Sequence, residues 1–280
     1  MVPATASPSF TKASLNWLGF VVLFQFVAYW KAWQWYLARV SYSLEESVGL
    51  FIVLIILGSM GYLSFRASDG LRRFSLWPIA LLLIIYGITT TFMPPIVYSA
   101  IAISSVLLTF YLAAFGNKPP VAFWGMALLT LPVVPSLQFY IGYPARVISA
   151  ALTVPLLQLN GLSVVREGTY LRWQNELLQF DAPCSGVTML WAGLFLTLVI
   201  SFFHRFNLKQ TLVALIVGSV LVLCGNILRA SSLFYLETGL FSPSEPWWHM
   251  GVGVITFLMT AYFILITLNR FELWCKKETR

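Results

Sequence analysis

The stretch TLVALIVGSVLVLCGNILRA, residues 211–230, decides the fold class of this chain. Its first 18 residues carry no charge, and a transmembrane helix needs about 20 predominantly apolar residues to cross about 30 Å of hydrocarbon. Similar runs recur along the chain, at 17–37, 48–65, 76–93, 97–116, 120–138, 186–203, 209–235 and 250–269. The sequence therefore predicts an all-α polytopic membrane protein.

The composition favours the same class. Of the 280 residues, 59% are hydrophobic and 10% are charged, whereas soluble domains are about half apolar and about a quarter charged. A net charge of +7 could suggest a nucleic-acid partner, but the basic residues are scattered between apolar runs. Such scattering is typical of signals that set membrane topology. We expect the protein to contact membrane lipids and to bind no nucleic acid.

The segment 144–160 decides the number of spans. It carries Arg146 near its start, and Pro155 within it opposes a regular helix. If this segment lies along the outer surface, eight spans remain, and the inner loops hold eleven basic and three acidic residues. If it crosses the membrane, the loop FRASDGLRRF (65–74) moves outside, against the positive-inside rule. We therefore predict a bundle of about eight transmembrane helices.

We predict a single integral membrane domain over residues 1–280. Its parts are the N-terminal spans (17–143), an interfacial helix with an extracytoplasmic segment (144–183), the last three spans (184–269) and a basic cytoplasmic tail (270–280). Alternating apolar and polar residues on both sides of Gly168-Thr169 suggest a small β-hairpin in the extracytoplasmic segment. Such strands could offer an edge to an extended peptide.

The last three spans have the same orientation in both topologies. The sixth runs inward from Cys184, the seventh returns outward through Arg229, and the eighth descends from His249. A thiol, a guanidinium and an imidazole are thus expected together at the outer face of the membrane.

Cys184 is expected to begin an apolar helix, at the outer end of the sixth span. A thiol near a helix N-terminus and close to cations loses proton affinity and becomes a better nucleophile. The alternative is a buried structural thiol, and topology alone leaves both open. Ser185 is either a rival nucleophile or a helix cap, with capping favoured, and Gly186 leaves room for a close backbone approach.

Arg229 is a charge in an otherwise apolar span. Such a charge costs about 2.5–3.5 kcal/mol on insertion scales, and it usually has a partner and a function. Asn226 lies three residues earlier on the same helical face. Arg229 could stabilise an oxyanion or bind a carboxylate, or it could extend to lipid headgroups. His249, after two interfacial tryptophans, is either an acid–base group or an interfacial side chain without a catalytic role.

Other reactive side chains are assigned no role. They are Cys224 in mid-span, Cys275 in the inner tail and His204 at the inner end of the sixth span. The cysteines have no metal-ligand spacing and no even pairing. We expect no metal site and no cofactor.

Four motifs in the C-terminal half carry a resemblance. They are LNGLSVVREG (159–168), APCSGVTML (182–190), NILR (226–229) and WHMGVGVITF (248–257). In this order the chain resembles the exosortase/archaeosortase family of membrane transpeptidases. The N-terminal half is similar only in hydropathy.

The resemblance implies a function and a location. Cys184 would be the nucleophile of a cysteine transpeptidase or protease, and Arg229 and His249 would be its catalytic partners, on the extracytoplasmic face of the cytoplasmic (inner) membrane. The substrates would be exported proteins with a C-terminal sorting signal, made of a short motif, a transmembrane helix and a basic tail, as in PEP-CTERM proteins. A thiolate would form a thioester, resolved by an acceptor that could be lipid- or polysaccharide-linked.

Two other functions stay open at the level of sequence. A membrane transporter or polysaccharide-export component would use Arg229 to bind an anion, although such proteins more often show charged or broken helices near the midplane. An intramembrane hydrolase would use Cys184 with water as the acceptor.

Overall fold

The computed structural model describes residues 12–40, 51–56, 58–59, 62, 75–174, 176–179, 185–240 and 246–278. Cys184 and half of the expected span 48–65 lie outside these residues. The chain divides into two compact units, 1–133 and 134–280. Each unit is described by itself.

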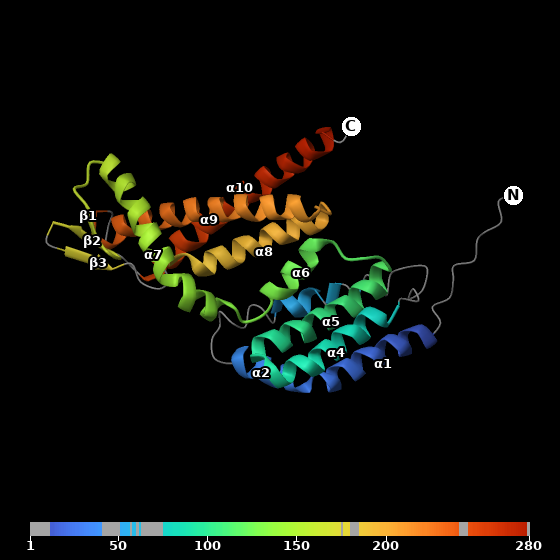
Figure 1. Ribbon diagram of the computed structural model, residues 1–280. Coiled ribbons are helices and arrows are strands. Elements are labelled where there is room, and N and C mark those ends of the chain that lie inside the picture. Colours follow the sequence, from blue (N-terminus) through green and yellow to red (C-terminus); the bar gives the residue numbers. More distant parts are fainter. Residues whose placement is uncertain are drawn as a thin grey trace. The chain divides into compact units, whose positions relative to one another are not determined.

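The N-terminal unit is helical in its described parts (Figure 1). Its helices are α1 (Lys12–Ala28), α2 (Trp30–Val40), α4 (Trp77–Phe92), α5 (Pro95–Phe115) and α6 (Val121–Leu129). The expected span 17–37 is divided, because α1 ends before Tyr29 and α2 begins after it. Helix α5 contacts α1, α2, α4 and α6, and it forms the centre of this unit.

A buried polar cluster joins α1 to α5. The Gln25 amide donates from Nε2 to Ser105 Oγ at 3.0 Å, and the Tyr29 hydroxyl donates to the same oxygen at 2.8 Å. Thr109 Oγ1 donates to Gln25 Oε1 at 3.1 Å. All four side chains are almost fully buried. Because the hydrophobic effect does not drive helices together within lipid, interhelical hydrogen bonds of this kind and close packing drive the association of membrane helices.

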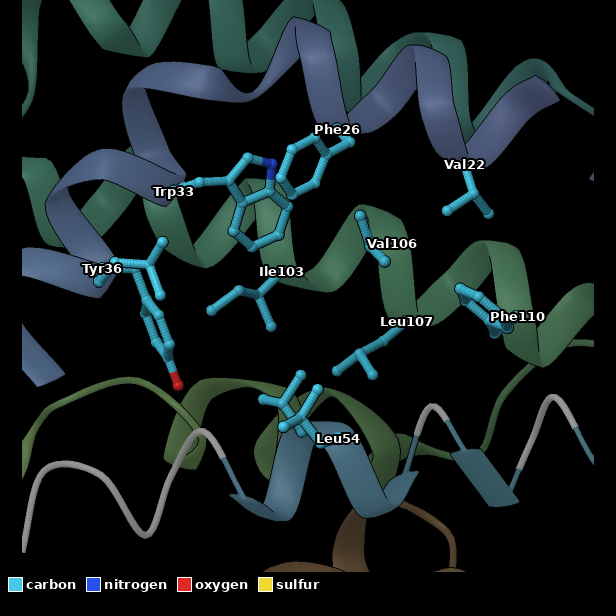
Figure 2. A pocket seen from close by; sticks show the side chains of 11 residues that line it. Val22, Phe26, Trp33, Tyr36, Leu54, Ile103, Val106, Leu107 and Phe110 are labelled. Atoms are coloured by element: carbon cyan, nitrogen blue, oxygen red, sulfur yellow. The ribbon is translucent and has the colours of Figure 1, made fainter. Parts of the chain in front are cut away.

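The same unit holds a cavity of about 270 Å³ (Figure 2). Phe26, Trp33, Ile103 and Val106 are among its lining residues, which are apolar or aromatic. Tyr36 also lines the cavity. Its hydroxyl donates to the backbone oxygen of Thr130 at 2.8 Å. This lining supplies shape but no group suited to acid–base or nucleophilic chemistry.

In its described residues, the C-terminal unit combines four helices with a small sheet. Its elements are α7 (Val134–Leu159), β1 (Val165–Glu167), β2 (Tyr170–Trp173), β3 (Glu176–Gln179), α8 (Val187–Phe203), α9 (Leu208–Glu237) and α10 (Pro246–Glu278). Helices α8, α9 and α10 contact one another. Helix α7 crosses α8 and α9 near the end where α8 begins and α9 finishes (Figure 1).

The sheet is antiparallel, with strand order β1-β2-β3. The turn expected at Gly168-Thr169 joins β1 to β2, but the expected hairpin is extended by a third strand that pairs with β2. Leu171 of β2 is fully buried in a cluster with residues of α7 and α9, among them Leu157 and Phe234. This apolar contact anchors the sheet beside the end of α9.

The helix boundaries in 120–160 differ from the expected segments. The span 120–138 is interrupted, because α6 ends at Leu129 and α7 begins at Val134; Pro132 disfavours a helical residue before it. The segment 144–160 is not a separate helix, since α7 runs through Pro144 and Pro155 to Leu159. Helices in membranes tolerate proline because neighbouring groups and local adjustments satisfy the freed backbone.

The membrane character rests on the helices. Four described helices are long and apolar enough to cross a membrane, namely Pro95–Phe115, Val134–Leu159, Leu208–Glu237 and Trp247–Lys277. Shorter apolar helices cover Trp17–Ala28, Trp77–Phe92 and Val187–Phe203. The protein is thus a mostly helical membrane protein with a small sheet, and the number of about eight spans stays a prediction.

Candidate active site

The chain enters α8 through a turn that only glycine fits well. Gly186 has φ +73°, in the left-handed region, and it caps the helix. A β-carbon at this position would lie 2.5 Å from Cγ of Asn226 on α9. Both the backbone conformation and the close approach favour glycine here. Cys184, two residues before it, lies outside the described residues.

Helix α7 contacts this turn and its neighbour on α9. The Ser185 hydroxyl donates to Oε1 of Gln138 at 2.9 Å and accepts the backbone N–H of Val187 at 3.3 Å. The Asn226 amide donates to Ser149 Oγ at 2.9 Å. Ser149, Ser185 and Asn226 are all less than 5% exposed. These contacts hold the residues that follow Cys184 against two other helices.

Gln138 and Ser149 are absent from the sequence-based site. A signal existed, since the two polar residues are separated by eleven positions, or about three turns, and therefore share one face of an apolar helix. The sequence does not reveal what that face meets. Only the crossing of α7 over α8 and α9 brings it to Ser185 and Asn226.

Arg229 lies three residues after Asn226 on α9 and is half-buried. Its guanidinium lies against α10, where a β-carbon on Gly253 would come within 3.4 Å of Nε and 3.7 Å of Nη2. Gly253 follows His249 by four residues, or about one helical turn. The guanidinium thus reaches α10 one turn from the imidazole-bearing residue.

His249 belongs to the first turn of α10. Its Nε2 lies 3.9 Å from Oε1 of Glu237, the last residue of α9, and the two side chains are 46% and 43% exposed. Trp247 and Trp248 stack beside it, with ring centroids 4.1 Å apart. Glu237 also escaped the sequence analysis, because its position opposite His249 depends on how α9 and α10 pair.

These contacts bring three helix segments to one end of the C-terminal unit. Gly186 meets Asn226, and Arg229 meets Gly253, so the start of α8, the last turns of α9 and the first turns of α10 adjoin. His204 lies at the other end of α8, where Nε2 is 2.9 Å from Oδ1 of Asn269. Within the described residues, no group of His, Cys, Asp and Glu side chains is suited to hold a metal ion.

A groove of about 520 Å³ runs between α9 and α10. Leu228 and Ser232 line it from α9, and Val252 and Thr256 line it from α10. Ser232 and Val252 follow Arg229 and His249, respectively, by three residues, so one end of the groove adjoins the site. Its mainly apolar walls suit a hydrophobic segment.

Comparison with known proteins gives one match. A family model described as transmembrane exosortase (Exosortase_EpsH) matches residues 16–266. This range extends the likeness into the N-terminal half, where the motifs alone gave only a similar hydropathy. No curated protein and no solved structure matched the chain. Since the model covers most of the sequence, and the apolar helices agree with a membrane protein, the chain belongs to the transmembrane exosortase family.

Proposed function

We propose that this exosortase is a cysteine transpeptidase or protease that cleaves C-terminal sorting signals of exported proteins. Each signal comprises a short motif, a transmembrane helix and a basic tail. The enzyme works in the cytoplasmic membrane with its active site on the extracytoplasmic face, and it transfers the cleaved protein to an acceptor. Family membership supports a membrane sorting enzyme in general; the residue roles below are our proposal.

One observation carries the proposal: Arg229 lies against Gly253, one turn from His249, while Asn226, one turn before Arg229, packs on the turn that follows Cys184. A nucleophile, an acid–base group and a cation need to come within reach of one substrate carbonyl. The contacts of the neighbouring residues support such a meeting at this end of the unit.

The chemistry proceeds in two steps. The Cys184 thiolate attacks the scissile carbonyl, a C–S bond forms, and the C–N bond breaks when His249 protonates the leaving amine. Arg229 stabilises the negative charge on the tetrahedral oxygen, as oxyanion-hole donors do. A nucleophile on the acceptor then attacks the thioester and releases the thiol. Hydrolysis follows if water takes the place of the acceptor.

The groove between α9 and α10 supports a membrane-embedded substrate. Its apolar lining and its position beside Arg229 and His249 suit the transmembrane helix of a sorting signal. A transporter with Arg229 as an anion-binding residue is the alternative, and it requires no covalent intermediate.

The test uses a reporter protein that ends in a motif, a transmembrane helix and a basic tail. We expect wild-type enzyme to shorten the reporter, and Cys184→Ala and Cys184→Ser to leave it uncut at equal enzyme levels, as read by mass spectrometry of its C-terminus. Cys275→Ala, which changes a thiol near the C-terminal end of α10 and outside the groove, serves as the matched control. Normal processing by Cys184→Ala would remove the nucleophile assignment.

A further inference from the structure

Arg146 is a charge in an apolar part of the chain. Between residues 74 and 165 the only charged side chains are Lys118 and Arg146. Lys118 follows the end of α5, whereas Arg146 lies inside α7, one of the helices able to cross a membrane. Charged residues within such helices are rare, and they usually face the bundle interior and mark a functional site.

The position of Arg146 on α7 relates it to the candidate active site. Gln138, Gly142, Arg146 and Ser149 are spaced by four, four and three residues, so they share one face of the helix. Gln138 bonds Ser185, and Ser149 bonds Asn226. Arg146 therefore lies between the two points at which α7 contacts the turn after Cys184 and the helix of Arg229.

The side chain folds back along its own helix. Its Nε donates to the backbone oxygen of Gly142 at 3.4 Å, and its Cζ lies 5.9 Å from the centre of the Tyr143 ring. The residue is half-buried. These contacts use Nε and one ring face, and the two terminal amino groups make no hydrogen bond or ion pair with any described residue.

A guanidinium held in this way presents a planar pair of donors. Two parallel N–H groups match the two oxygens of a carboxylate, and such charged pairs are stronger than neutral hydrogen bonds. A ligand for this fork has to be anionic and has to reach the turn after Cys184, where the substrate polypeptide is processed. An acidic side chain close to the scissile peptide bond meets both requirements.

We propose that Arg146 binds a carboxylate side chain of the polypeptide substrate and thereby sets specificity next to the cleavage position. This inference rests on the proposed function for its substrate. Arg146 holds the chain of the substrate and takes no part in bond breaking. Its loss therefore weakens substrate binding more than it slows the chemical step.

The experiment pairs enzyme variants with reporter variants. Acidic residues within four positions of the cleavage site are changed singly to their amides, and each reporter is cleaved by wild type and by Arg146→Gln in detergent. With an acidic reporter, we expect Arg146→Gln to raise KM about tenfold to a hundredfold, the value of hydrogen bonds to a charged group, with kcat nearly constant. With the matching amide reporter, the two enzymes should have nearly the same KM.

A charge reversal sharpens the test. Arg146→Glu should cleave a reporter that carries lysine at the same position better than it cleaves the acidic reporter. Arg270→Gln is the matched control, since it removes an equal charge from an exposed position toward the C-terminal end of α10, and it should leave KM unchanged for every reporter. An equal loss on acidic and amide reporters would overturn the proposal, because it would indicate a structural or catalytic role.

Binding separates this inference from the proposed function. The Cys184→Ala variant in nanodiscs is titrated with fluorescent acidic and amide peptides, with and without Arg146→Gln. Preference for the acidic peptide that disappears with Arg146→Gln supports the carboxylate site even if no reporter is ever cleaved. Dependence on anionic lipid in the nanodisc, with equal binding of both peptides, would assign the guanidinium to a lipid headgroup and overturn the proposal.

Discussion

The guanidinium of Arg229 lies beside Gly253 of α10, where a β-carbon on the glycine would lie 3.4 Å from Arg229 Nε, about a van der Waals contact. This contact places a positively charged side chain against α10. It also gives the arginine a defined orientation, which a side chain that only extends to lipid headgroups would not need.

We expect Arg229→Lys to lower kcat/KM about 10²–10³-fold, the loss typical of one oxyanion donor. Lysine keeps a charge but lacks the planar fork of donors. The measurement is reporter cleavage at matched enzyme levels. Near-normal cleavage by the lysine variant would show that any cation suffices at this position.

Gly186→Ala tests the turn into α8. Alanine with φ near +73° costs about 1–2 kcal/mol in backbone energy, and its β-carbon would in addition overlap Asn226. We expect a loss of thermal stability together with most of the activity. Gly168→Ala is the control, because Gly168 has φ +64° but open space around it; it should lose stability alone. Equal effects of both substitutions would mean that the contact with Asn226 is unimportant.

Ser149→Ala removes the hydroxyl that accepts the Asn226 amide. Loss of a partner for a buried polar group costs about 1–3 kcal/mol. We expect a lower melting temperature and weaker cleavage, since Asn226 also supports the turn after Cys184. Ser219→Ala should be nearly silent, because the Ser219 hydroxyl donates to the oxygen of Leu215 in its own helix. A thermal-shift assay compares the melting temperatures of the two variants, and Ser149→Ala should have the lower one.

Substitutions of His249 and Glu237 should reduce cleavage to different extents. Solvent-exposed ion pairs contribute about 0–1 kcal/mol, and both side chains are nearly half exposed. Glu237→Gln should therefore reduce cleavage by about fivefold at most. His249→Ala should reduce it by about 10²–10⁴-fold, as loss of an acid–base group does. A larger effect of Glu237→Gln than of His249→Ala would contradict the role given to the histidine.

Sidedness follows from thiol labelling in a Cys224→Ala, Cys275→Ala background. A membrane-impermeant maleimide should reach Cys184 from the extracytoplasmic side of oriented vesicles. A Cys184→Ser version of the same background reports unspecific labelling. Modification from the cytoplasmic side alone would reverse the topology on which the proposed function depends.

Helices in the C-terminal unit followed from hydropathy because apolar length alone defines them. The expected span 209–235 corresponds closely to α9 (Leu208–Glu237). The span 250–269 gave only the middle of α10, which continues to Glu278 through polar residues. A hydropathy window ends where the apolar residues end, whereas a helix ends where its backbone hydrogen bonds end. The two ends therefore need not coincide.

The environment of the site was less accessible to sequence reasoning. Arg229 could be singled out because a charge in an apolar span is conspicuous without any partner. Gln138 and Ser149 are ordinary polar residues until α7 crosses α8 and α9. Contacts of this kind depend on the crossing of helices, and no local pattern in the chain encodes a crossing.

The hydrogen bond between Gln25 and Ser105 joins residues 80 positions apart. At a synthesis rate of about 5–20 residues per second, Ser105 is made roughly 4–16 s after Gln25. During this interval α1 carries the Gln25 amide before its hydrogen-bond partner, Ser105, has been synthesised. The hydrogen bond between α1 and α5 can therefore form only after α5 has been synthesised. The rate of translation sets the length of this delay in the N-terminal unit.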